Sequence, residues 1–223
     1  MTIPDRPLIH CQHLPAFTRN TWDSNVEALR GAQPCPLGQA WLPTPQKEFL
    51  PATVQAGWTD TDLIVFAELE DCDIFNPVTE LNALSFRYGD VFEMFLRPEE
   101  QAAYCEFHVT PQNQKLQVRF PSSEAFLAPR KADGIPASWL ISDRQFDSQV
   151  RVNTAANRWA VLAAIPFGMV ADSGRAGAGS RWLFSFSRYD YTRSQPAPVL
   201  SSTSPHRELN YHRQQDWGTL LFV

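Results

Sequence analysis

The chain has 223 residues, of which 43% are hydrophobic and 19% are charged, so it has enough apolar material to form a packed core. Its formal net charge of -5 at pH 7 argues against nucleic acid as a partner, because nucleic-acid-binding proteins usually carry a basic surface. No apolar run approaches membrane-spanning length, and the first residues lack the basic and apolar parts of a signal peptide. We therefore expect no membrane contact, and either a cytoplasmic location or secretion by a signal that this sequence does not include.

The chain begins with a stretch rich in proline. Residues 1–35 contain Pro4, Pro7, Pro15 and Pro34, which interrupt regular structure, so we expect an irregular segment that packs on the main domain. Residues 22–29 within it can form a short helix or turn, capped by Asp23 or Ser24. We expect residues 36–223 to form one β domain.

Runs of alternating polar and apolar residues, separated by turn signals, follow one another through the rest of the chain. They predict strands at residues 39–42, 52–58, 63–69, 91–96, 104–109, 115–120, 148–153, 158–167, 181–191 and 218–223. About ten strands with little helix indicate an all-β fold, an antiparallel two-sheet β-sandwich of the jelly-roll or immunoglobulin-like type. The loops at residues 70–89 and 192–216 are long, and long loops in compact domains often carry function.

The predicted hairpin of residues 91–109 has an unusual composition. On one side its strands present apolar residues such as Phe92 and Met94. On the other side they present Glu93, Tyr104, Glu106 and His108 among apolar neighbours. This mixture predicts a sheet face that meets water and a solute dissolved in it.

Cysteine and acidic residues give weaker signals. The four cysteines form no CxxC pair, which argues against a zinc or redox site, and we expect Cys105 in the core. Cys11 and Cys35 are candidates for a disulfide in an oxidising compartment, and reduced thiols are the alternative. The acidic residues Glu70, Asp71 and Asp73 are of the type that ligates calcium, and a solvated loop is the alternative.

The sequence contains none of the familiar catalytic motifs. GxSxG, HExxH and a glycine-rich phosphate loop are all absent. Glu93 and Glu106 are the candidates for a glycosidase carboxylate pair, but no neighbouring residue indicates a raised pKa, so we expect binding and no enzymatic activity.

Several segments taken in order resemble the family 9 carbohydrate-binding modules, a β-sandwich group related to DOMON domains. The resemblance covers roughly residues 36–223. Its segments are LIVFAELEDCDI (63–74), GDVFEMFLRP (89–98), YCEFHVTP (104–111), RWAVLAAIPF (158–167), WLFSFSRYD (182–190) and YHRQQDWGTLLF (211–222).

This resemblance implies a saccharide or glycan held between two aromatic rings, with polar side chains around it. Carried over position by position, it implies a site with these ligand-binding residues: Glu93, His108, Ser187, Tyr211, Phe86, Tyr88 and Arg188. His108 stands where the family often has arginine, and Tyr211 stands where it has one tryptophan. Phe86 or Tyr88 takes the place of the other tryptophan. We expect the Tyr211 ring to be exposed in its loop.

Other readings of these residues stay open. Instead of binding a ligand, Glu93 can form a structural salt bridge, and Arg188 can form an ion pair with Asp190. We expect Trp159, Trp182 and Trp217 in the core. Some relatives of this fold are haem proteins ligated by methionine together with histidine or lysine. Met94 and His108 are the available pair here, but strand alternation places them on opposite sides of the hairpin, so haem is the second hypothesis and a hydrolase the third.

Overall fold

The computed structural model describes residues 5–15, 17–18, 21–127 and 135–223, and strands are its main regular elements. The strands are β1 Leu8–His13, β2 Cys35–Pro36, β3 Ala52–Trp58, β4 Asp62–Glu70, β5 Val91–Pro98, β6 Tyr104–Val109, β7 Lys115–Phe120, β8 Asp147–Asn153, β9 Arg158–Pro166, β10 Arg181–Asp190, β11 Val199–Ser202 and β12 Gly218–Phe222. The helices are short: α1 Trp22–Ala28, α2 Ser123–Leu127, α3 Phe167–Val170, and the 3-10 turns η1 Ser85–Arg87, η2 Ala137–Trp139, η3 Thr154–Ala156 and η4 Gln214–Asp216. Among the helices of the described ranges, none is both long and apolar enough to cross a membrane.

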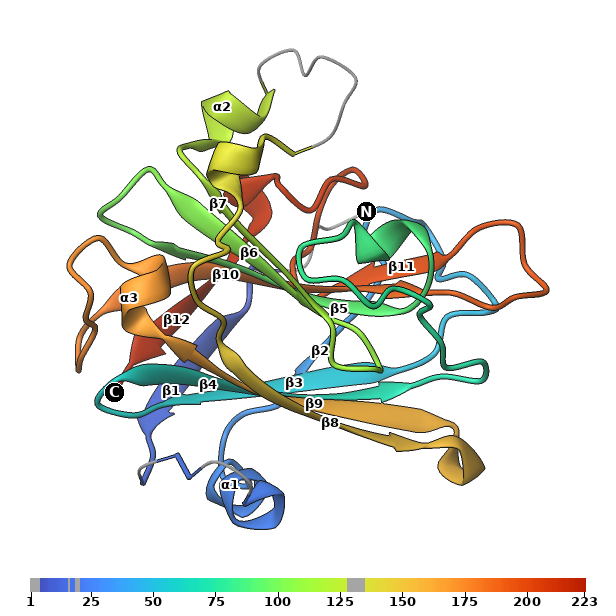
Figure 1. The fold of residues 1–223 in the computed structure, drawn as a ribbon, viewed down its shortest axis with the longest axis horizontal. Coiled ribbons are helices and arrows are strands. Elements are labelled where there is room, and N and C mark those ends of the chain that lie inside the picture. The colour runs from blue at the N-terminus through green and yellow to red at the C-terminus, as the bar shows by residue number, and fades with distance from the viewer. Residues whose placement is uncertain (1–4, 16, 19–20, 128–134) are drawn as a thin grey trace.

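The strands form two layers that are joined along one side (Figure 1). The first layer has the order β7-β6-β5-β10-β12, with β11 paired to β10, and the second has the order β3-β4-β9-β8. β1 connects them, because its first part pairs with β12 and its last two residues pair with β3. The all-β sandwich expected from the sequence is confirmed, and its jelly-roll or immunoglobulin-like connectivity stays a prediction.

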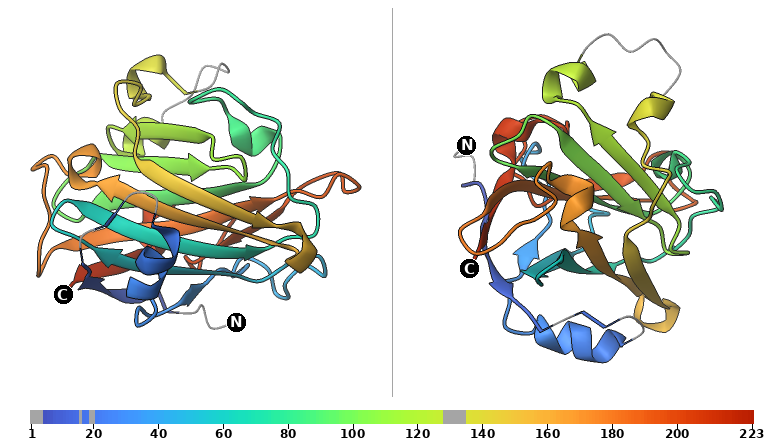
Figure 2. Two further views of the ribbon diagram at one scale, coloured as in Figure 1. Left: turned by 60° about the horizontal axis from the view of Figure 1, so that its bottom comes forward. Right: turned by 60° about the vertical axis from the view of Figure 1, so that its left-hand side comes forward.

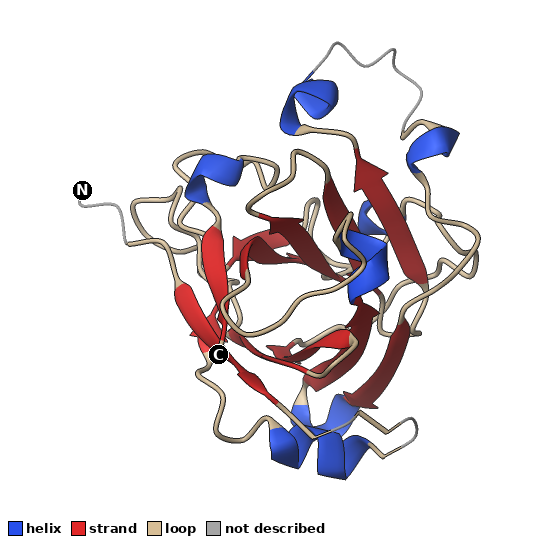
Figure 3. Ribbon diagram, turned by 90° about the vertical axis from the view of Figure 1, so that its left-hand side faces the viewer, coloured by secondary structure: helices blue, strands red, loops and turns tan. Residues whose placement is uncertain are grey.

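The core between the layers follows from the alternation of side chains along each strand. In β5 the residues Phe92, Met94 and Leu96 point into it and are fully buried. Trp159 and Trp182 fill the same space, which confirms their predicted core positions. Viewed from the end, the strands surround this interior (Figure 3), and α3 contributes Phe167, Met169 and Val170 to the core.

A second apolar cluster covers the outer face of the first layer. It includes Phe95, Tyr104, Tyr211 and Trp217, so the predicted burial of Trp217 is also confirmed. Residues 203–217 fold back over this face, and α2 lies on the same side of the molecule, opposite α1 (Figure 2). The face is therefore enclosed by loops and is not an open sheet surface.

The structure also corrects several expectations about the elements. The segment expected to be irregular contributes β1, whose pairing with β12 and β3 is parallel rather than antiparallel. Residues 39–42 do not form a strand, and only Gly38 makes an isolated bridge, to Ser202. The loop of residues 192–216 contains β11, and its short length and single partner strand explain why alternation did not reveal it. The helix expected at residues 22–29 is present as α1.

Met94 and His108 lie on opposite faces of the first layer, as the alternation predicts. Met94 belongs to the core between the layers, whereas the His108 ring contacts Phe86 on the outer side. The two side chains cannot ligate one haem together.

Candidate functional site

Pairing between β5 and β6 places two carboxylates and an imidazole side by side on the outer face of the first layer. Glu93 lies opposite His108 in the register, and Glu106 precedes His108 by two residues on the same strand. Because side chains alternate along a strand, all three point away from the core between the layers. The hairpin thus has the polar face that its sequence predicts.

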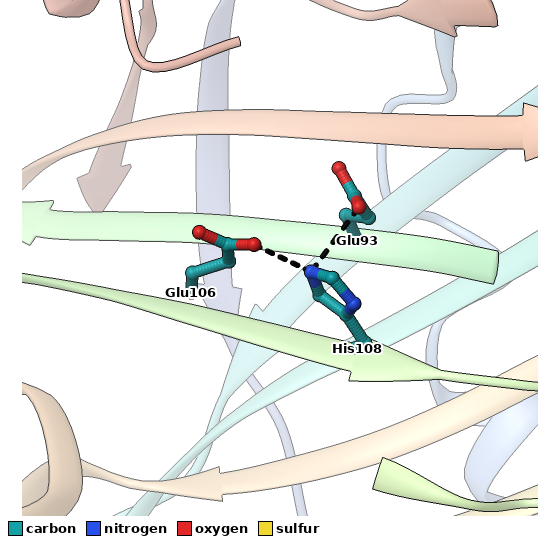
Figure 4. Close-up of side chains that lie close together, drawn as sticks. All are labelled: Glu93, Glu106 and His108. Carbon is teal, nitrogen blue, oxygen red and sulfur yellow. Dashed lines mark hydrogen bonds and ion pairs between the residues drawn. The ribbon is translucent and has the colours of Figure 1, made fainter. Parts of the chain in front are cut away.

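His108 lies between the two carboxylates (Figure 4). Its Nε2 atom is 2.6 Å from Oε1 of Glu106 and 3.1 Å from Oε1 of Glu93. Glu93 is 2% exposed, Glu106 is 5% exposed and His108 is fully buried. Nδ1 of His108 is buried without a hydrogen-bond partner among the residues that the structure describes. We call Glu93, Glu106 and His108 the glutamate cluster.

The charges of the glutamate cluster depend on one another. Burial raises the pKa of Glu93 to about 8; the nearby His108 lowers this pKa and Glu106 raises it. Burial alone lowers the pKa of His108, but the charge of Glu93 and the hydrogen bond to Glu106 outweigh burial and raise it. One imidazolium therefore stabilises one carboxylate, while a second negative charge in the same place is disfavoured.

A pocket of about 380 Å³ opens above the glutamate cluster. Both Glu93 and Glu106 line it, together with Asn210. Its ring-bearing lining residues are Phe86, Phe95, Phe126, Tyr189, Tyr211 and His212. The two long loops that the sequence analysis singled out both contribute, since Phe86 lies in residues 70–89 and Tyr211 lies in residues 192–216. This size and mixture are typical of small-ligand sites, in which apolar walls enclose a few polar groups.

Tyr211 differs from its expected environment. Its ring was expected to be exposed, but the residue is 6% exposed and packs against Phe95 and Tyr189, so that prediction is wrong. Its hydroxyl donates a hydrogen bond to the carbonyl of Arg188 at 3.1 Å, and its own carbonyl accepts one from Trp217 Nε1 at 2.7 Å. These bonds hold the loop against the sheet. The Tyr211 ring still lines the pocket, as a wall beside Glu93 and not as a free platform.

The other implied residues are divided between the pocket and its surroundings. Phe86 lines the pocket, whereas Tyr88 is 56% exposed and is not among the lining residues. Ser187 lies beside Glu93 in the strand pairing, but it is fully buried and its hydroxyl donates to Ser202 Oγ at 3.1 Å. Ser187 therefore shares a sheet face with Glu93 but is not among the lining residues, and its ligand contact stays a prediction.

Arg188 belongs to a second acidic site, in the opposite direction from the pocket. Its Nη2 atom is 3.1 Å from Oδ2 of both Asp71 and Asp190, and all three residues are at most 5% exposed. Asp90 completes this group, which we call the aspartate cluster, and it accepts backbone hydrogen bonds from Phe75 and Tyr191. Arg188 is not a lining residue of the pocket; its structural alternative, the ion pair with Asp190, is present, and its ligand contact stays a prediction.

Two groups of side chains have the composition of a cation site among the described residues: the glutamate cluster and the carboxylates of the aspartate cluster. Of the three residues considered for calcium, only Asp71 belongs to such a group. Asp73 forms an ion pair with Arg193, and Glu70 is exposed. The Arg188 guanidinium already provides the positive charge next to Asp71.

Most lining residues were not among the ligand-binding residues implied from the sequence, and two of them, Phe126 and His212, contact each other. Phe126 comes from α2, in a stretch whose sequence predicts only a connection between strands. Its ring stacks on the His212 ring, with centroids 3.5 Å apart. Nδ1 of His212 is 2.9 Å from the Tyr104 hydroxyl, and its Nε2 is 3.6 Å from Oε2 of Glu106. His212 could have been identified as a binding residue because it follows Tyr211 in the sequence, but no sequence pattern connects Phe126 to either residue.

Comparison with known proteins places this geometry in a recognised fold. A candidate carbohydrate-binding protein from Bacteroides uniformis has a similar structure, with a TM-score of 0.72 and 14% sequence identity, over 97% of this chain and 99% of that one. A family 9 carbohydrate-binding module from Caldicellulosiruptor kristjanssonii in complex with cellotriose gives a TM-score of 0.60 at 14% identity, over 97% and 93% of the two chains. A structure of such a module from the same organism in complex with glucose has a TM-score of 0.59 and 13% sequence identity, over 98% of this chain and 96% of that one.

These similarities extend over nearly the whole chain, so the protein has the fold of the family 9 carbohydrate-binding modules. No family model matches the sequence, and no curated protein matches it. At 13–14% identity the likeness establishes the fold, and the ligand has to be argued from the pocket.

Proposed function

We propose that this protein binds a saccharide in the pocket above the glutamate cluster, without cleaving it. The observation that carries the proposal is the composition of the pocket: aromatic walls around two buried carboxylates and the Asn210 amide. The faces of sugar rings pack on aromatic side chains, and their hydroxyls need polar partners held in fixed directions. The fold supports the same ligand class, since two structural neighbours were determined with cellotriose and with glucose.

The surroundings of the pocket leave room for more than one sugar unit. A hollow of about 720 Å³ shares Asn210 and His212 with the pocket and extends toward Arg97 and Arg213. A sugar unit in the pocket can therefore continue into this hollow. We propose that the ligand is an oligosaccharide or the end of a longer glycan.

The geometry of the carboxylates favours binding over hydrolysis. In a glycosidase one carboxylate attacks or activates water while the other donates a proton, and the two flank the scissile bond. Here Glu93 and Glu106 both face the same nitrogen of His108, so neither is free to act from the opposite side of a sugar. A cluster fixed in this way is suited to accepting hydrogen bonds from a bound ligand.

The test is a glycan array followed by calorimetry on every glycan that binds, with reducing-sugar release measured in the same samples. We expect Phe86→Ala to weaken binding about tenfold or more, because it removes a wall of the pocket. Tyr88→Ala is the matched control, since it removes a neighbouring aromatic side chain outside the pocket. Equal effects of the two variants, or the absence of any binding glycan, would contradict the proposal; sugar release would replace binding with hydrolysis.

A further inference from the structure

The pocket floor holds two carboxyl groups beside one fully buried imidazole. Glu93 and Glu106 share Nε2 of His108, and Glu106 has a second, longer contact with Nε2 of His212 at 3.6 Å. Among the described lining residues there is no lysine or arginine. The guanidinium of Arg188 on β10 pairs with Asp71 and Asp190 on the other face of the sheet, and those of Arg97 and Arg213 line the neighbouring hollow.

The groups that face Glu93 can be named for each neighbouring element. β6 contributes Glu106 and His108, β10 contributes Tyr189, and residues 203–217 contribute Tyr211 and His212. Burial raises the pKa of the Tyr189 hydroxyl, and the charges of Glu93 and Glu106 raise it further. Burial also raises the pKa of Tyr211, and Glu93 adds to it. Both tyrosines therefore experience the negative field of the floor.

The walls of the pocket are compatible with a cation. Phe86, Phe95, Phe126 and Tyr189 line it, and the faces of such rings attract positive charge. An ammonium group has three hydrogen-bond donors and no acceptor, which matches a floor of two carboxylates. A hydroxyl group can also donate to a carboxylate, but it brings no charge to offset the second negative one.

We infer that the pocket selects saccharides that carry a free, protonated amino group, such as the hexosamine end of a glycan, over their neutral counterparts. The inference rests on the proposed saccharide site and specifies its ligand class. The ligand ammonium binds on the pocket side of Glu93 and Glu106, at carboxylate oxygens that do not face His108, and takes over the charge compensation that a proton on Glu93 provides in the absence of ligand. The pKa of about 8 for Glu93 fits this exchange, because near neutral pH a proton occupies Glu93 until a cation replaces it.

The experiment uses three β-1,4-linked disaccharides that differ only in the substituent at carbon 2: cellobiose, its fully deacetylated diamino counterpart from chitosan, and the acetylated form in which the charge is removed. The full chain is treated with a chelator, so that no metal occupies the carboxylates, and titrated by calorimetry at about pH 6.5. We expect the amino disaccharide to bind at least about tenfold tighter than the other two. In buffers of different ionisation enthalpy its binding should release close to one proton as Glu93 ionises, whereas cellobiose should release none.

Variants connect the selectivity to the glutamate cluster. Glu106→Gln and Glu93→Gln keep the shape of the floor and remove one ionisable group each, so each should reduce the affinity for the amino disaccharide about tenfold more than it reduces the affinity for cellobiose. Glu80→Gln, an exposed residue outside the pocket, is the matched control. Thermal melting checks that each variant is folded, and either of the two pocket variants is sufficient for the test.

The outcomes separate this inference from the proposed function. Equal binding of cellobiose and the amino disaccharide leaves saccharide binding intact and overturns the charge selectivity. Selectivity that survives both Glu93→Gln and Glu106→Gln also overturns it, because the cation then binds elsewhere. If none of the three disaccharides binds and the glycan array finds no other ligand, the proposed function fails and this inference fails with it.

Discussion

The two buried acidic clusters of this protein differ in how their negative charge is balanced. In the aspartate cluster, Nη2 of Arg188 lies 3.1 Å from two carboxylates, and this guanidinium is fully enclosed. In the glutamate cluster, an imidazole lies between two carboxylates at the floor of a pocket. A guanidinium stays charged at every accessible pH, whereas an imidazole can lose its charge.

This difference suggests separate roles on the two sides of one sheet. A cluster that carries its own permanent cation and lies outside the pocket contributes to the fold. A cluster with a titratable cation, next to a space of about 380 Å³, can respond to what enters that space. The predictions below test whether the two clusters differ in this way, beginning with the largest expected effect.

The largest loss of stability is expected for Arg188→Met. It leaves Asp71, Asp90 and Asp190 buried without their cation, and breaking a buried ion pair from one side costs about 3–5 kcal/mol. Urea unfolding at neutral pH measures the loss. A change below about 1 kcal/mol would mean that the aspartate cluster does not depend on Arg188, and the contrast between the clusters would be lost.

The second prediction concerns the pH dependence of stability. The folded-state pKa of Glu93, about 8, lies above its ordinary value, so the folded chain binds more protons than the unfolded chain in the interval between them. Stability is therefore full at acidic pH and is lost as the pH rises through about 8. The raised pKa of His108 acts in the same direction, and so do those of Asp90, about 8, and Asp190, about 7.

We expect the unfolding free energy to fall by a few kcal/mol between about pH 6 and about pH 9. Glu93→Gln should flatten part of this slope, because glutamine cannot ionise; the aspartate cluster retains the remainder. Urea unfolding of both proteins across this range provides the measurement. A stability that rises with pH in the wild-type chain would show that the buried carboxylates are compensated in a different way.

A smaller effect is expected for Tyr211→Phe, at a residue that contacts both regions. Its hydroxyl donates to the Arg188 carbonyl and its ring lines the pocket, so the variant loses one buried hydrogen bond and keeps the wall. We expect a loss of about 1 kcal/mol in unfolding free energy and unchanged ligand affinity. Weaker binding together with full stability would instead assign the hydroxyl to the ligand.

The smallest effect is expected for Arg181→Met, on the same strand as Arg188. Arg181 forms a partly exposed ion pair with Glu99 at 3.0 Å, with 48% and 38% of the two side chains accessible. Solvent screens such a pair, so the loss in urea unfolding should be about 0.5 kcal/mol or less. A loss similar to that of Arg188→Met would mean that burial does not explain the importance of Arg188.

The sequence was sufficient for the strand hairpin at the centre of the site. Side chains alternate strictly along β5 and β6, so the placement of Glu93, Glu106 and His108 on one face followed from their spacing, and the register confirmed it. The same reasoning placed Met94 on the opposite face, in the core. Strand pairing converts a local pattern into a spatial one without distant information, and this part of the fold was therefore predictable.

The walls of the pocket depended on the tertiary structure. Tyr211 stands in an irregular loop, and its burial results from bonds to Arg188 and from packing against Phe95, which is more than a hundred residues away in the chain. Phe126 and His212 meet in the same way, by the folding of two distant segments over one sheet. The sequence by itself determined which residues share a face of a strand, because that depends on a period of two residues. Only the tertiary structure decided which of them lie at the floor of a pocket, because burial depends on which distant segments cover the sheet.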